Sequence, residues 1–117
     1  MAMSLMSLMT SDGTVLIDRV EWVDGFFGRC RGLIGRSTIG QDRGMALVPC
    51  KAVHTCFMRF SLDVIFFSRD FYVVHIAKNI LPYRIACGGR KAWGVVEVQS
   101  GWFPWDRLKE GDRLVFK

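Results

Sequence analysis

The sequence lacks any apolar run that approaches the roughly 18 residues of a membrane helix. It contains no internal repeat, and no low-complexity stretch follows the Met- and Ser-rich N-terminus. That N-terminus has neither a basic n-region nor an A-x-A-like cleavage site, so no export signal is visible. These absences predict a soluble, cytoplasmic protein without a membrane span.

Cysteine is sparse as well. The four cysteines, at positions 30, 50, 56 and 87, form no C-x-x-C pair and no dense framework. A domain of this size builds a core without disulfide bridges. We therefore predict reduced, mostly buried thiols that pack as small apolar groups.

Apolar residues, by contrast, are abundant: half of the 117 residues are hydrophobic and 13% are aromatic. This composition excludes an intrinsically disordered chain, and the length suits one domain rather than two. Residues 1–13 are rich in Met and Ser and close with the turn signal Ser11-Asp12-Gly13. We predict a flexible N-terminal arm over residues 1–13, a single β-rich domain over residues 14–117, and a monomer.

Short runs of β-branched and aromatic residues, bounded by turn signals, predict about seven strands. These predicted strands cover residues 14–23, 44–48, 53–58, 62–67, 71–76, 92–99 and 114–116. Apolar residues at helical spacing predict a short helix over Phe26–Ile34, and Pro104–Leu108 suits one further helical turn. The pattern predicts a mainly β fold: a single compact β-barrel or sandwich with one or two short helices.

The stretch from Cys50 to Ser68 combines the most apolar predicted strands with unusual polar chemistry. The turn after Phe67 predicts a hairpin between residues 62–67 and 71–76, with strand 53–58 in the same sheet. Asp63 lies inside this apolar run, and a carboxylate buried alone is costly. Arg59 is the nearest candidate cation, so we predict a coupled Arg59–Asp63 pair at the edge of a cleft, with His54 close by.

The string VHTCFMRFSLDVIF, which covers residues 53–66, resembles the signature of the uncharacterised family DUF192. The similarity continues at Gly44-Met45, Val96-Glu97 and Gly111-Asp112, and it spans most of residues 15–116. It implies a small β-rich domain without an established activity. Many members have Trp-Met-Lys-Asn where this chain has FMRF, so the role of that asparagine is not carried over. Members are often exported, in contrast to the cytoplasmic location predicted above.

Four polar residues form the set of ligand-binding candidates: His54, Arg59, Asp63 and Glu97. Glu97 is in this set because it lies inside a predicted strand with apolar neighbours. Two interpretations stay open, a buried ion-pair network that fixes strand register and a cleft that recognises a ligand. The resemblance to DUF192 assigns these residues no role.

The leading hypothesis is a non-enzymatic binding or accessory domain, with a polar cleft for a small ligand or a protein partner. An alternative is a small hydrolase or metal-assisted enzyme that uses His54 with Asp63 or Cys56. Both hypotheses need side chains that converge in space, and sequence spacing does not decide whether they do.

Charge supports a further alternative, nucleic-acid binding through the arginines of the predicted helix. The formal net charge is +5, with 16 Lys and Arg against 11 Asp and Glu. The arginines are scattered along the chain, which is typical of a solvated surface. We therefore do not expect nucleic acid to be the partner. The helix arginines concerned are Arg29, Arg31 and Arg36.

We predict that the purified protein contains no stoichiometric transition metal and no cofactor. The spacing Cys50-x-x-x-His54-x-Cys56 offers soft ligands, but no residue is selected as the fourth ligand of a closed site. Elemental analysis tests this expectation. About one zinc ion per chain, lost in Cys56→Ser, would contradict it and favour the metal-assisted enzyme.

Overall fold

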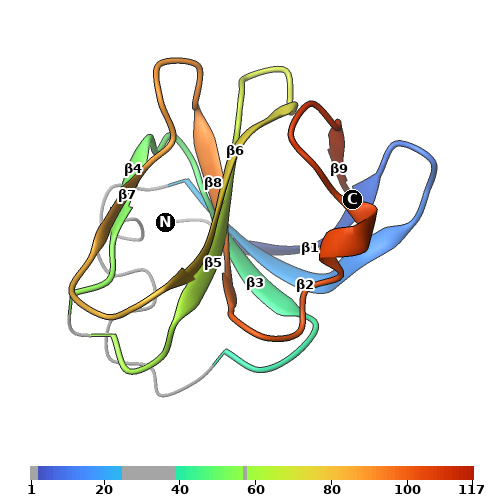
Figure 1. Ribbon diagram of the computed structural model, residues 1–117. Helices are drawn as coiled ribbons and strands as arrows, with labels where there is room; N and C mark the ends of the chain where they lie inside the picture. Colours follow the sequence, from blue (N-terminus) through green and yellow to red (C-terminus); the bar gives the residue numbers. More distant parts are fainter. Residues whose placement is uncertain (1–2, 25–38, 57) are drawn as a thin grey trace.

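The computed structural model describes residues 3–24, 39–56 and 58–117 (Figure 1). Strands dominate these residues, and the one helix among them is a single 3-10 turn, which confirms the mainly β fold. The strands are β1 Met3–Thr10, β2 Val15–Val23, β3 Arg43–Leu47, β4 Ala52–His54, β5 Leu62–Phe67, β6 Val73–Ile80, β7 Ile85–Cys87, β8 Gly94–Gln99 and β9 Leu114–Phe116. The 3-10 helix is Trp105–Arg107.

Seven strands form one large sheet in the order β6-β5-β8-β3-β2-β1-β9, while β4 and β7 form a separate two-stranded sheet. Only the β2–β3 pairing is parallel among the described strands. The two edges of the large sheet meet briefly, because Leu114 N donates to Phe71 O at 2.7 Å and Val73 N donates to Asp112 O at 2.8 Å. The sheet therefore curls into a sandwich-like fold without closing into a barrel.

The curled sheet buries side chains on both faces, because strand side chains alternate between them. In β5, Ile65 and Phe67 pack on the concave face, whereas Leu62, Val64 and Phe66 pack on the opposite face. All six residues of β5 are buried, as expected for a strand covered on both sides. The predicted hairpin is confirmed, since β5 pairs with β6 in antiparallel register.

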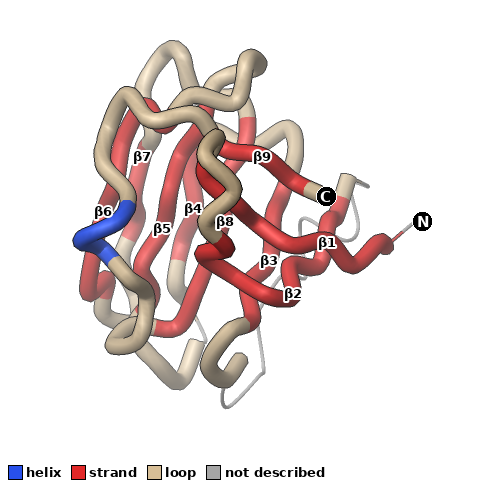
Figure 2. Tube along the Cα trace, turned by 90° about the vertical axis from the view of Figure 1, so that its right-hand side faces the viewer, coloured by secondary structure: helices blue, strands red, loops and turns tan. Residues whose placement is uncertain are grey.

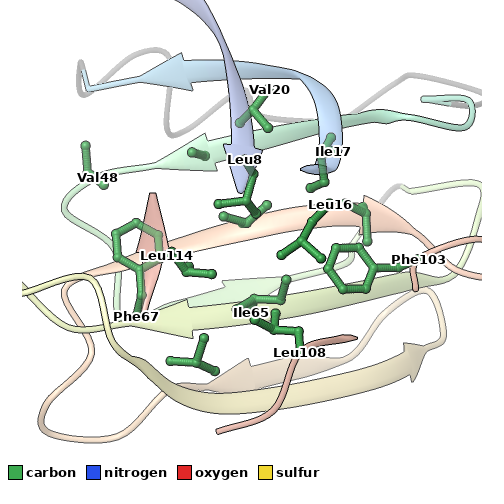
Figure 3. Close-up of a cluster of buried hydrophobic side chains, with 14 residues drawn as sticks. Leu8, Leu16, Ile17, Val20, Val48, Ile65, Phe67, Phe103, Leu108 and Leu114 are labelled. Atoms are coloured by element: carbon green, nitrogen blue, oxygen red, sulfur yellow. The ribbon is translucent and has the colours of Figure 1, made fainter. Parts of the chain in front are cut away.

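Two apolar clusters result, which we call the inner core and the outer core. The inner core lies within the curl (Figure 3) and consists of Leu8, Leu16, Ile17, Val20, Ala46, Val48, Ile65, Phe67, Val73, Val96, Val98, Phe103, Leu108 and Leu114. The outer core consists of Val23, Met45, Leu47, Val53, Met58, Phe60, Leu62, Val64, Phe66, Ala92 and Val95. Figure 1 shows β4 and β7 on one side of β5 and β8, with β9 and the 3-10 helix on the other.

The structure corrects the prediction of a flexible arm over residues 1–13. Most of this segment is β1, which pairs with β2 along one edge and with β9 along the other. Leu8 is fully buried in the inner core. The pairing satisfies backbone groups of β2 that would otherwise form an open edge, and this benefit depends on residues far from the arm in sequence.

The prediction that strand 53–58 joins the large sheet is also wrong. The strand ends at His54, and β4 pairs instead with β7, which the sequence did not predict. Thr55 ends it: its hydroxyl donates to Leu81 O at 2.6 Å and accepts from Arg84 N at 2.8 Å. This fully buried threonine ties the turn to the segment before β7 rather than to β5.

The predicted helix over Phe26–Ile34 and the three helix arginines lie outside the described residues. The predicted helical turn near Pro104 is present as the 3-10 helix, which is drawn in blue in Figure 2. None of the helical segments that the structure describes is long and apolar enough to cross a membrane.

Candidate functional site

The four candidate residues do not meet in one cleft. His54 and Arg59 are exposed, whereas Asp63 and Glu97 are only 2% and 5% exposed. Within the described part of the chain, Arg59 forms no ion pair with Asp63. The predicted Arg59–Asp63 pair is therefore wrong, because neutral donors satisfy the Asp63 carboxylate instead.

Asp63 accepts three hydrogen bonds from three different parts of the fold. Its Oδ1 accepts from Asn79 N at 2.8 Å and from Ser100 Oγ at 2.7 Å. Its Oδ2 accepts from Trp105 Nε1 at 3.0 Å. A buried carboxylate with this many donors no longer needs a cation partner, so the Asp63 carboxylate has a structural role.

An irregularity in the β5–β6 ladder explains the Asn79 contact. Leu62 pairs with Ile80 and Val64 pairs with Ala77, so two residues of β6 lie opposite Asp63 alone. Such a bulge takes a backbone N–H out of the ladder, and Asn79 adopts a positive φ of 56° there. The Asp63 carboxylate accepts the displaced N–H. The sequence did not predict these donors. The available signal was the indole N–H of Trp105, next to Pro104, because an indole N–H needs an acceptor when it is buried.

Glu97 has a different environment. In β8 it lies opposite Met45 of β3 and Val64 of β5, both members of the outer core. No hydrogen bond or ion pair joins its carboxyl group to any residue in the described ranges. Burial raises the pKa of the Glu97 carboxyl group from 4.5 to about 7, because an apolar environment disfavours the charged form.

The two buried carboxyl groups thus lie on opposite faces of the same sheet. Asp63 shares its face with Ile65 and Phe67, and Glu97 shares its face with Val95. One carboxyl group is satisfied by three donors, and the other is left without a described donor. A carboxyl group in an apolar environment with no described donor is costly, which marks Glu97 as the candidate for function. In the described part of the chain, the fully buried side-chain polar atom without a partner is Trp102 Nε1.

His54 does not line the same region as Glu97. Val53 of β4 is buried in the outer core, so its neighbour His54 points to the opposite side of the strand and is exposed. Met58 and Phe60 are instead the residues of this segment that pack in the outer core. Arg59, between them, is exposed.

The side chains that the hydrolase or metal-assisted enzyme would use do not come together among the described residues. No three His, Cys, Asp or Glu side chains of these residues converge as metal ligands would. Exposed His54 is not joined to Asp63, whose oxygens are taken by the three donors described above.

The cysteines of the described ranges are more accessible than the sequence predicted. None of the Cys50, Cys56 and Cys87 thiols of the described ranges is in a disulfide; the first two residues are half-buried and the third is exposed. The Cys50 thiol donates to Ala52 O at 3.1 Å. The prediction of mostly buried thiols is therefore wrong for these three residues, because they lie in or beside the small two-stranded sheet rather than in the large one.

Comparison with known proteins supports the fold but no activity. The family model DUF192, described as "Uncharacterized ACR", matches residues 7–116. No curated protein matches the sequence.

Two solved structures share the fold. One is a protein of unknown function from Novosphingobium aromaticivorans DSM 12444, with a TM-score of 0.80 and 23% identity over 97% of this chain and 84% of that chain. The other is described as a candidate transcription regulator from Sinorhizobium meliloti 1021, with a TM-score of 0.82 and 23% identity over 98% of this chain and 94% of that chain. At this identity the likeness shows the fold alone.

We predict that Asp63→Ala lowers the free energy of unfolding by about 2 to 4 kcal/mol, because it removes the buried acceptor of three hydrogen bonds that join separate parts of the fold. Trp105→Phe should cost less and should be non-additive with Asp63→Ala in a double-mutant cycle measured by urea unfolding. Arg59→Ala is the control, and we expect it to cost less than about 0.5 kcal/mol and to add simply. Full additivity of Trp105→Phe would contradict the assigned hydrogen bond.

The raised pKa of Glu97 predicts a pH dependence of stability. The unfolded chain releases this proton near pH 4.5, while the folded protein holds it up to about pH 7. The contribution of Glu97 to the free energy of unfolding is therefore fully present below pH 4.5. It decreases as the pH rises to about 7 and is constant above that pH. Glu97→Gln lacks this titration, so its stability advantage should grow over that window to about 3 kcal/mol. Urea unfolding of both proteins from pH 4.5 to 8 measures the difference. A constant difference would refute the assignment.

Proposed function

The chain belongs to the DUF192 family of uncharacterised proteins, and we propose that it is a non-enzymatic binding domain whose ligand is read by the Glu97 carboxyl group. The observation that supports this proposal is the burial of that carboxyl group among apolar side chains, with no donor among the described residues. Stability alone would favour an apolar residue at this position, so the presence of a carboxyl group supports a functional use for it.

The chemistry of this environment favours a small amine. A carboxylate among Met45, Val64 and Val95 gains most from a donor that carries positive charge, because charge-assisted hydrogen bonds strengthen where water is excluded. The apolar part of the amine would then pack against the same side chains. Its binding would lower the pKa of Glu97 from its raised value, since a cation favours the charged form.

The cover of the outer core supports access for such a ligand. β4 and β7 are three residues each and pair only with each other among the described strands. An isolated two-stranded sheet is marginally stable, so local opening costs less here than the removal of a strand from the large sheet. Val53 and Ala86 are the residues through which this small sheet packs on the outer core.

The test is a thermal-shift screen with primary amines, using alcohols and carboxylic acids of the same carbon skeleton as controls. We expect selected amines to raise the melting temperature of the parent protein, by an amount that grows with ligand concentration. Glu97→Gln and Glu97→Leu should abolish the amine effect. Because both variants are expected to be more stable than the parent, loss of binding in them is not a result of unfolding.

Two outcomes would count against this proposal. One is an amine-induced shift of the same size in Glu97→Gln, which would place the amine elsewhere. The other is a Glu97→Leu variant less stable than the parent above pH 7, since that result would mean that the carboxyl group is already paired and structural.

A further inference from the structure

A cleft lies away from Glu97, at the end of the large sheet where the β5–β6 turn and the β7–β8 connection meet. Its volume is about 620 Å³, within the range of small-ligand sites. We call it the basic cleft, and it is defined by Lys51, Arg69, Arg90 and Lys91. We propose that the basic cleft binds a small molecule that carries two or more linked phosphate groups.

The backbone holds the three contributing segments together. Trp93 N donates to Phe67 O at 2.8 Å, which fixes the β7–β8 connection beside β5 just before its turn. Gly88 N donates to Lys51 O at 2.8 Å, which fixes the segment before β4 to the same connection. The cations therefore stand on turns that main-chain bonds have already positioned, and preorganisation lowers the entropic cost of binding.

The side chains add further order. Lys51 Nζ donates to Arg90 O at 3.4 Å, which places an ammonium group directly at the β7–β8 connection. The Arg69 guanidinium lies over the Trp93 ring, 6.0 Å from its centroid. Tyr72, which is 45% exposed, forms another part of the wall. Arg69 is thus held by an aromatic face and keeps its N–H groups available for an anion.

The balance of charge distinguishes the basic cleft from a neighbouring one. Four cations line it, and Asp70 is the one acidic residue among its lining residues. Neither Arg69 nor Arg90 nor Lys91 forms an ion pair with a carboxylate anywhere in the described ranges. A smaller cleft of about 320 Å³, in contrast, balances two cations with two carboxylates; these residues are Arg107, Arg113, Asp12 and Asp112. Of these two clefts, the basic cleft is therefore the one with an excess of positive charge.

Phosphate chemistry matches this arrangement best. Guanidinium groups bind phosphate oxygens in a bidentate manner, and lysine ammonium groups supply point charges to the remaining oxygens. Cations crowded at one site repel one another when the site is empty, and a polyanion relieves that repulsion. A single carboxylate would neutralise only part of this charge, whereas linked phosphates carry a comparable charge in a compact group.

Isothermal titration with inorganic pyrophosphate at low ionic strength tests the proposal, with ATP as a second probe. Arg90→Glu combined with Lys91→Glu should weaken pyrophosphate binding by at least about tenfold, because it removes two charge-assisted contacts. Arg107→Glu with Lys109→Glu is the matched control: it makes the same change in net charge at exposed residues outside the basic cleft. We expect this control to bind pyrophosphate within about twofold of the parent protein.

Further measurements distinguish binding in the basic cleft from diffuse electrostatic attraction. Glu97→Gln should leave pyrophosphate binding unchanged, so the basic cleft and the Glu97 proposal stand or fall separately. Equal weakening by both charge-reversal pairs would show diffuse attraction and overturn the site. Failure of both pyrophosphate and ATP to bind the parent protein would overturn it as well. So would binding of a single-stranded oligonucleotide that both pairs weaken equally, since that result indicates an extended surface rather than a small-molecule cleft.

Discussion

The arrangement of the fold depends on the hydrogen bonds that the Asp63 carboxylate accepts. The carboxylate joins β5 to the bulge of β6, to the residue after β8 and to the 3-10 helix through three hydrogen bonds. β5 lies between β6 and β8 in the large sheet, so these bonds connect it to both of its neighbours. They also hold the segment that inserts Phe103 and Leu108 into the inner core. The hydrogen bonds to this one carboxylate thereby determine which side chains fill the space within the curled sheet.

The sheet separates stability from candidate function by its two faces. The inner face carries a carboxyl group with three donors, which is what a structural role requires. The outer face carries Glu97, whose pKa burial raises to about 7 and which no described residue satisfies. The energetic cost of that group is tolerated because the rest of β8, with Val95, Val96 and Val98 fully buried, contributes apolar burial on both faces.

The turns carry a different kind of chemistry from the strands. Exposed cations occur in the turns where the ends of several strands approach one another. Main-chain hydrogen bonds, such as that from Trp93 N to Phe67 O, hold these turns in place. Rigid strands with variable turns are a common basis for binding sites. The buried carboxyl group and the basic cleft are therefore independent features, one belonging to the sheet face and the other to its end.

The sequence by itself determined the mainly β fold, the β5–β6 hairpin and most strand positions, because alternation and turn residues act over a few neighbours. It also drew attention to Asp63 and Glu97, since carboxyl groups in apolar runs are conspicuous. Tertiary structure alone decided that β1 joins the sheet and that β4 leaves it. Tertiary structure also decided that the hydrogen-bond partners of the Asp63 carboxylate are donors 16, 37 and 42 residues away in sequence, and not Arg59. Local patterns do not encode such partners, because burial and hydrogen-bond satisfaction depend on which distant segments the fold brings together.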